Sequence, residues 1–308
     1  MNKIYQRTIG GYISIGGIGL HSGRKVKITL RPAPENSGYI FVNTEQAFPT
    51  EIVASFDKVV DTTLATTIGD GNTQIKTIEH LISAFRGMDI DNVIVEVEGD
   101  EVPIMDGSSA PFVYLIKKAG VVEQKRLRKF IIVKNQIRFY EDDKYIEILP
   151  SDDFKIEFTI DFPHPLIGKQ SFFYHASPEN YEKEIAKART FGFYNEVEYL
   201  KSKGLALGGS LENAVVIGKD GILNEEGLRF KDEFVRHKIL DLIGDIALLG
   251  YPVIGHIRAY KSGHALNNKL CKELFTNRRD FSVVELREDY LPLHNTYDAP
   301  FLENQRPL

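Results

Sequence analysis

Titratable side chains recur at intervals of four residues in the most apolar stretch of the chain. His237, Asp241 and Asp245 stand there among isoleucines and leucines, and residues four apart lie on one face of an α-helix. An imidazole and a carboxylate one turn apart are able to bind the same metal ion. The same spacing is also typical of an exposed helix face on which His237 and Asp241 form a hydrogen bond. The spacing alone does not decide between these two interpretations.

A catalytic metal site requires a third protein ligand, and His80 is the best candidate in the sequence. It directly follows Glu79, a carboxylate that would stand beside the metal without being needed as a ligand. Three protein ligands, an open position for water and a nearby carboxylate that accepts the water's proton are what a catalytic zinc ion requires. An isolated helical histidine is more often structural, and neither the H-E-x-x-H motif nor its inverted form is present.

His264 is a candidate for proton transfer to a leaving group. It lies in the segment 262–267, where a predicted strand passes into a predicted helix and side chains often face a cleft. A lone histidine in a loop is more typical of a structural role. If Asp245 contacts it, however, the imidazole is held charged and is suited to donate a proton.

The glycine-rich segment 16–23 invites comparison with nucleotide-binding loops. It lacks the Gly-Lys-Ser/Thr ending of a P-loop, and Ser22 stands where a dinucleotide fingerprint starting at Gly17 needs glycine. We therefore predict a tight hairpin turn, which places His21 near the site.

Periodicity predicts the elements that must position these residues. Alternating runs bounded by Pro, Gly or Asn predict strands at 25–30, 39–42, 92–98, 130–133, 145–149, 154–160 and 253–260. Apolar residues at helical spacing predict helices at 77–86, 110–118, from about 178, 233–249 and 265–274. The glycine-rich segment 204–209 predicts a connection.

The order of these elements is similar in the two halves, which predicts a duplicated α+β unit. We place the first domain at residues 1–125, the second at 126–280 and an extended tail at 281–308, with the charged stretch 123–129 as the separator. The tail is proline-containing and has no apolar period.

Composition excludes several classes of protein. Of the 308 residues, 43% are hydrophobic and 26% are charged, as in folded proteins rather than disordered ones. A net charge of -5 argues against a nucleic-acid partner. Cys271 is the only cysteine, so an intramolecular disulfide and a cysteine-rich zinc site are both excluded. Asp241 and Asp245 interrupt the richest apolar segment, and no signal peptide is visible, so we expect a cytoplasmic protein without stable membrane insertion.

Several motifs in order along residues 3–274 resemble the UDP-3-O-acyl-N-acetylglucosamine deacetylases, zinc enzymes of bacterial lipid A synthesis. The motifs are GIGLHSG at 17–23, TIEHL at 77–81, PIMDGS at 103–108, ARTF at 188–191, GGSLEN at 208–213, RHKILDLIGD at 236–245 and GH at 263–264. The resemblance implies two related α+β domains, each a sheet packed with helices, with the active site between them. It implies no nucleic-acid partner and no obligate protein partner.

The resemblance also implies a mechanism in which the acetamide of a UDP-linked, 3-O-acylated amino sugar is hydrolysed to an amine and acetate. It assigns Zn²⁺ to His80, His237 and Asp241. It further assigns Glu79 as general base, Thr190 as oxyanion donor, His264 as general acid, Asp245 as the residue that orients His264, and Lys238 as a substrate contact on a different helix face.

For the substrate, the resemblance implies that Phe162 stacks on uracil and that the insertion at about 189–210 forms an acyl passage. Candidate lining residues are Phe191, Phe193, Leu200, Leu205 and Leu207. Two alternatives stay open from the residues. A zinc amidohydrolase of another N-acylated amino sugar would use the same catalytic groups, and a non-catalytic nucleotide-lipid binding protein would have no use for Glu79, His264 and Thr190.

Overall fold

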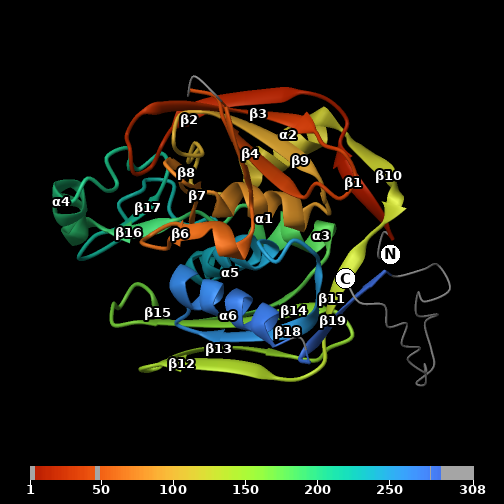
Figure 1. The fold of residues 1–308 in the computed structure, drawn as a ribbon. Helices are drawn as coiled ribbons and strands as arrows, with labels where there is room; N and C mark the ends of the chain where they lie inside the picture. Colours follow the sequence, from red (N-terminus) through yellow and green to blue (C-terminus); the bar gives the residue numbers. More distant parts are fainter. Residues whose placement is uncertain (1–3, 46–48, 278, 286–308) are drawn as a thin grey trace.

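Two β-sheets form the outer layers of the molecule, and the main helices of both halves lie between them (Figure 1). The structure is a computed structural model that describes residues 4–45, 49–277 and 279–285. The central helices are α1 (Glu79–Gly87), α2 (Ala110–Ala119), α5 (Glu233–Ala247) and α6 (His264–Thr276). This is the predicted α+β arrangement. Within the described ranges, no helix combines the length and apolar character needed to cross a membrane.

The first sheet has the strand order β2-β3-β9-β4-β5. Neighbouring strands are antiparallel except for β4 and β9, which run parallel. This pair is parallel because the connection between the two strands passes through α1, a crossover that returns the chain in the same direction. The strands are β2 (Ile13–Ile18), β3 (Lys25–Pro32), β4 (Tyr39–Asn43), β5 (Thr50–Val53) and β9 (Val93–Glu98).

Five of the seven strands of the second sheet repeat this topology in the order β12-β13-β18-β14-β15, and β11 (Lys129–Val133) also pairs with β18. The central strand β18 is again antiparallel to one hairpin and parallel to the other. Helix α5 precedes β18 and α6 follows it, as α1 and α2 flank β9. The repeat confirms the two related units. The strands are β12 (Ile137–Glu141), β13 (Lys144–Leu149), β14 (Phe154–Phe162), β15 (Gly168–His175) and β18 (Val253–Tyr260).

Two segments differ from the predicted boundaries. The charged separator is itself strand β10 (Val121–Leu127), which pairs with β1 (Tyr5–Ile9), and it leads directly into β11 (Lys129–Val133). Strand β19 (Phe281–Glu285) pairs with β11, so the first part of the tail predicted from residue 281 is a strand of the second sheet. The rest of the predicted tail, residues 286–308, lies outside the described residues.

Shorter elements surround the space between the halves. One sheet comprises β6 (Val59–Asp61), β7 (Thr67–Asp70) and β8 (Thr73–Ile75), preceded by a 3-10 turn at Phe56–Lys58. The segment between β15 and α5 contains α3 (Pro178–Asn180), a π-helical turn (Tyr181–Ile185), β16 (Phe191–Phe193), α4 (Tyr194–Ser202) and β17 (Val215–Ile217). Helix α4 was not predicted, because none of its residues is buried and its sequence has no clear apolar face.

Helices α1 and α5 pack directly against each other, and Gly244 is the reason they can approach so closely. A Cβ atom at this position would overlap the backbone carbonyl of Glu79. Glycine therefore lets the backbone of one helix touch the backbone of the other. The residues that begin α1 are held against the middle of α5, where the predicted stripe of titratable residues lies.

Candidate functional site

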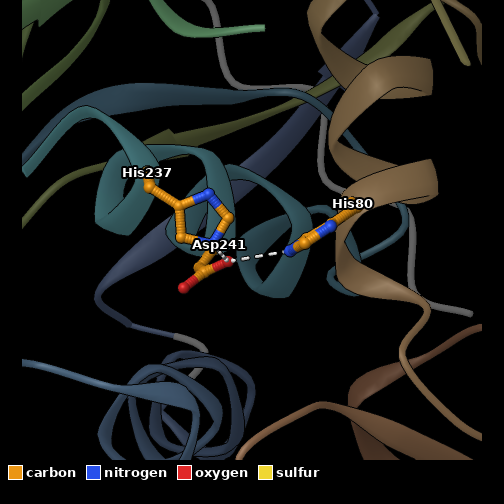
Figure 2. A group of neighbouring side chains, drawn as sticks. All are labelled: His80, His237 and Asp241. Carbon is orange, nitrogen blue, oxygen red and sulfur yellow. Dashed lines mark ion pairs between the residues drawn. The ribbon is translucent and has the colours of Figure 1, made fainter. Parts of the chain in front are cut away.

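Three side chains that could hold a metal ion converge where α1 meets α5 (Figure 2). His80 comes from α1, and His237 and Asp241 come from α5, with ligand atoms all within 4.8 Å of one another. The Nε2 atoms of His80 and His237 lie 3.6 and 3.3 Å from Oδ1 of Asp241. All three residues are buried, at most 4% exposed. An exposed polar helix face is therefore excluded.

The donor atoms fit a cation in position and in protonation. Oδ1 of Asp241 is buried and has no hydrogen-bond partner among the described residues, which is costly for a carboxylate unless a cation is present. The Nδ1–H of His237 donates to the carbonyl of Ala188 at 3.1 Å, so the lone pair of its Nε2 faces Asp241. Burial lowers the pKa of His80, which favours the neutral imidazole that binds metals.

Lys238 lies at the same site rather than on another helix face. Its Nζ donates to Oδ2 of Asp241 at 2.7 Å, and its side chain lines the same cavity. The prediction that Lys238 points elsewhere is wrong because its long side chain folds back across one turn of α5. Burial opposes ionisation of Asp241, but its neighbours His237 and Lys238 hold the pKa of its carboxyl well below the usual range.

Glu79 begins α1 and is 3% exposed. Its Oε2 accepts a hydrogen bond of 3.0 Å from the backbone N–H of Thr66. Burial raises the pKa of the Glu79 carboxyl to about 7, although the charge of His264 opposes the shift. A carboxylate that titrates near neutrality is suited to accept and release a proton.

His264, the first residue of α6, forms the predicted contact with Asp245, with 2.8 Å between Nδ1 and Oδ2. Burial disfavours the charged imidazole, but the charge and hydrogen bond of Asp245, together with the charges of Asp241 and Glu79, raise the pKa of His264 to about 9. Asp245 also accepts hydrogen bonds from the Asn267 amide, at 2.8 Å, and from the Thr66 hydroxyl, at 2.6 Å. Neither Asn267 nor Thr66 was predicted.

A cavity of about 370 Å³ opens onto His237, Asp241 and His264. Its walls contain several of the predicted site residues together with further basic side chains, which suit an anionic ligand. The residues that matter here are His237, Lys238, Asp241, His264, Thr190, Phe162, Phe191, Lys144 and Lys261.

Thr190 is held in this wall by a loop of the first half. Its backbone N–H donates to the carbonyl of Gly107 at 2.8 Å. Gly107 has a φ of 84° and approaches Asn213 so closely that a Cβ would overlap the Asn213 carbonyl. The loop that carries Gly107 and the segment that carries Thr190 therefore fix each other.

The predicted aromatic residues gather beside the cavity. The ring of Phe162 lies 5.7 Å from that of Phe191 and 5.9 Å from that of Phe193, centroid to centroid. Phe193 does not line the cavity itself. Among the other predicted lining residues, Leu200 and Leu205 are half-buried and Leu207 is 48% exposed.

His21 lies in the predicted hairpin turn between β2 and β3 and does not line the cavity. The side chain is buried, and its Nδ1 accepts a hydrogen bond of 3.4 Å from the backbone of Ala206. His21 thus contacts the segment that was predicted to form the acyl passage.

The chain is similar to a family of known proteins over nearly its whole length. The family model described as UDP-3-O-acyl N-acetylglycosamine deacetylase matches residues 6–276. The chain is 50% identical over 282 residues to the UDP-3-O-acyl-N-acetylglucosamine deacetylase of Myxococcus xanthus, an alignment that covers 92% of this chain and 90% of that protein. It is 49% identical over 300 residues to the protein of the same name from Histophilus somni, covering 96% and 98%.

Proposed function

The chain belongs to the UDP-3-O-acyl N-acetylglycosamine deacetylase family, and from this premise we propose that the cluster between α1 and α5 is its active site. The protein removes the N-acetyl group from UDP-3-O-acyl-N-acetylglucosamine in lipid A biosynthesis, giving acetate and UDP-3-O-acyl-glucosamine. One observation carries the assignment of the site. A buried ligand trio lies beside a carboxylate with a pKa near 7 and an imidazole with a pKa near 9, and His237, Asp241 and His264 of this group line one cavity.

We propose Zn²⁺ as the cofactor and His80, His237 and Asp241 as the residues that would hold it. Two imidazoles and one carboxylate are a donor set typical of catalytic zinc. When bound, the ion supplies Lewis acidity, which lowers the pKa of water and polarises the acetamide carbonyl. Lys238 supports the set by keeping Asp241 ionised.

Glu79 is the proposed general base. The hydrolytic water must lose a proton as it attacks the acetamide carbon, and the Glu79 carboxylate lies next to His80 in the same turn of α1. The hydrogen bond from Thr66 engages Oε2, so Oε1 would accept the proton of the water. Burial makes the protonated form of Glu79 accessible near neutral pH.

Thr190 and His264 would act on the other atoms of the amide. Thr190 lines the cavity, and its hydroxyl would donate a hydrogen bond to the oxygen that becomes negative during attack. The amine is a poor leaving group unless its nitrogen is protonated, and His264, charged through Asp245, would supply that proton.

The rest of the substrate would extend along the cavity. Phe162 offers an aromatic face for uracil, and Lys144, Lys238 and Lys261 offer charges for the diphosphate. Phe191 and Phe193 lead toward the proposed acyl passage, where His21 contacts the passage segment. We propose the cytoplasm, as predicted from the sequence, as the place of the reaction.

The direct test is incubation of the purified protein with UDP-3-O-acyl-N-acetylglucosamine, followed by mass analysis. We expect loss of one acetyl group, abolition by a chelator and recovery on adding Zn²⁺. The same assay with other N-acylated amino sugars tests the alternative of a broader amidohydrolase. Turnover of those sugars at an equal rate, or full activity in the chelator, would contradict the proposal.

Asp245→Asn should move the alkaline limb of the pH profile of kcat/KM toward lower pH. In the native site His264 must be protonated to act, and Asp245, with Asp241 and Glu79, raises its pKa to about 9. Activity is therefore retained below that pH and lost above it. Without the Asp245 charge, burial still lowers the pKa of His264, so protonation is lost at lower pH.

The measurement is kcat/KM between acidic and alkaline pH for the native protein, Asp245→Asn and the surface control Asp153→Asn. Asp153 also pairs with a histidine, His175, but both are about half exposed and far from α5 in sequence. The control should keep the native profile. An alkaline limb that stays in place in Asp245→Asn would remove His264 from the role of general acid.

A further inference from the structure

Thr66 contacts both proton-transfer groups of the site: its backbone N–H donates to Glu79, and its hydroxyl lies 3.3 Å from Nδ1 of His264. It precedes β7 and is 2% exposed. Its backbone carbonyl accepts from the N–H of Ile78 at 3.3 Å, and its backbone N–H donates to Glu79 at 3.0 Å. These two bonds fix Thr66 against the first turn of α1.

The side chain of Thr66 faces the second half of the molecule. Its hydroxyl donates to Oδ1 of Asp245 at 2.6 Å, across a sequence separation of 179 residues. Oδ2 of the same carboxylate faces His264 and Asn267, each at 2.8 Å. Among the described residues, Thr66 donates to Oδ1, whereas His264 and Asn267 donate to Oδ2. Together these three donors fix the rotation of the Asp245 carboxylate, which orients His264.

We propose that Thr66 is a positioning residue that fixes the general base relative to the general acid. This inference rests on the proposed function and adds a residue to which neither the sequence patterns nor the resemblance gave a role. The base lies on α1 and the acid on α6. The distance between them therefore depends on how the two halves of the molecule pack against each other. Thr66 joins them through its own backbone and hydroxyl, without contacting the ligand trio.

The chemistry explains why this separation matters. The base must remove a proton on one side of the acetamide carbon while the acid delivers a proton to the nitrogen on the other side. Small displacements of catalytic groups reduce the rate strongly even when the substrate still binds. A loss of the Thr66 hydroxyl should therefore lower kcat and leave KM nearly unchanged.

The test compares Thr66→Val, which removes the hydroxyl but keeps the shape and the backbone N–H, with Thr66→Ser, which keeps the hydroxyl. We expect kcat of Thr66→Val to fall by about tenfold to a hundredfold, because the lost hydrogen bond was made to a buried charge. Thr66→Ser should stay within about threefold of the native kcat, since the bond is retained. Thr67→Val is the matched control, because Thr67 is also buried and follows directly in β7.

Metal content and thermal midpoint should stay native in all three variants, which separates positioning from a general structural role. A Thr66→Val rate equal to that of Thr67→Val, or a Thr66→Ser rate as low as that of Thr66→Val, would overturn the inference. In an Asp245→Asn background the Thr66→Val change should have a smaller effect than in the native protein, since the Thr66 hydroxyl acts mainly through Asp245, at 2.6 Å, and lies farther, at 3.3 Å, from Nδ1 of His264. Independent, multiplying losses would also overturn it.

A spectroscopic readout keeps this test separate from that of the proposed function. The Nδ1 proton of His264, hydrogen-bonded to Asp245, should give a low-field proton resonance that disappears in His264→Gln. We expect this resonance to move in Thr66→Val and to stay in place in Thr66→Ser and Thr67→Val. An unchanged resonance in Thr66→Val refutes the positioning role, whether or not the native protein releases acetate.

Discussion

Glu79→Gln should keep its bound metal and lose nearly all turnover. Glutamine has the shape of glutamate and still offers an oxygen to the N–H of Thr66, so the first turn of α1 stays in place. Its amide cannot accept the proton of the attacking water. We expect kcat to fall by at least about a hundredfold, equivalent to about 2.7 kcal/mol of transition-state stabilisation.

The measurement pairs steady-state kinetics with metal analysis of the same sample. Glu98→Gln is a suitable control, because Glu98 forms an exposed pair with Lys27 on the first sheet and should be replaceable without effect. Glu79→Asp is expected to fall between native and Glu79→Gln, since the base is kept but withdrawn by one methylene. A native rate for Glu79→Gln would exclude Glu79 as the base, and loss of metal would place it in the ligand set.

The proximity of the two candidate metal ligands on α5 could be predicted from the sequence because helix geometry alone fixes it. Residues four apart share a face, so the proximity of His237 and Asp241 needs no knowledge of the tertiary structure. The third ligand was different. His80 reaches Asp241 only because α1 packs on α5 at Gly244, a contact between distant segments that periodicity does not reveal. Its choice depended on the chemistry of catalytic zinc and on the resemblance.

The residues around Asp245 also show that contacts between distant segments cannot be predicted from local sequence patterns. Asn267 lies three residues after His264 on α6, and residues three apart share a helix face. This spacing could have identified Asn267 as a neighbour of the site. Thr66 had no such signal. It lies in a segment with three other threonines, and nothing local separates it from Thr62, Thr63 or Thr67. Its role depends on a contact that spans most of the chain.

The segments whose structure was predicted wrongly lie at the edges of sheets and on the surface of the molecule. Strand β10 was taken for a separator because its many charged residues mask the strand pattern, as is common where a strand pairs on one side only. Strand β19 lies at the end of its sheet, and only Phe281 among its residues is buried. Buried elements such as β18 were predicted to the residue, because burial imposes the apolar alternation that the prediction uses.

His237→Ala should fail differently from Glu79→Gln, through loss of the metal itself. Removing one imidazole leaves two protein donors, too few for a stable catalytic site, so metal content should fall well below that of the native protein. Turnover should fall by about a thousandfold or more, because both the Lewis acid and its orientation are lost.

Thermal unfolding gives a readout that does not depend on activity. A metal that joins α1 to α5 stabilises the folded chain, so a chelator should lower the midpoint of the native protein. The same chelator should have almost no effect on His237→Ala. His175→Gln, at an exposed histidine of β15, is the control and should respond as the native protein does. Full metal retention by His237→Ala, with a native response to chelator, would remove His237 from the ligand set and leave His80 and Asp241 without the partner that defines the site.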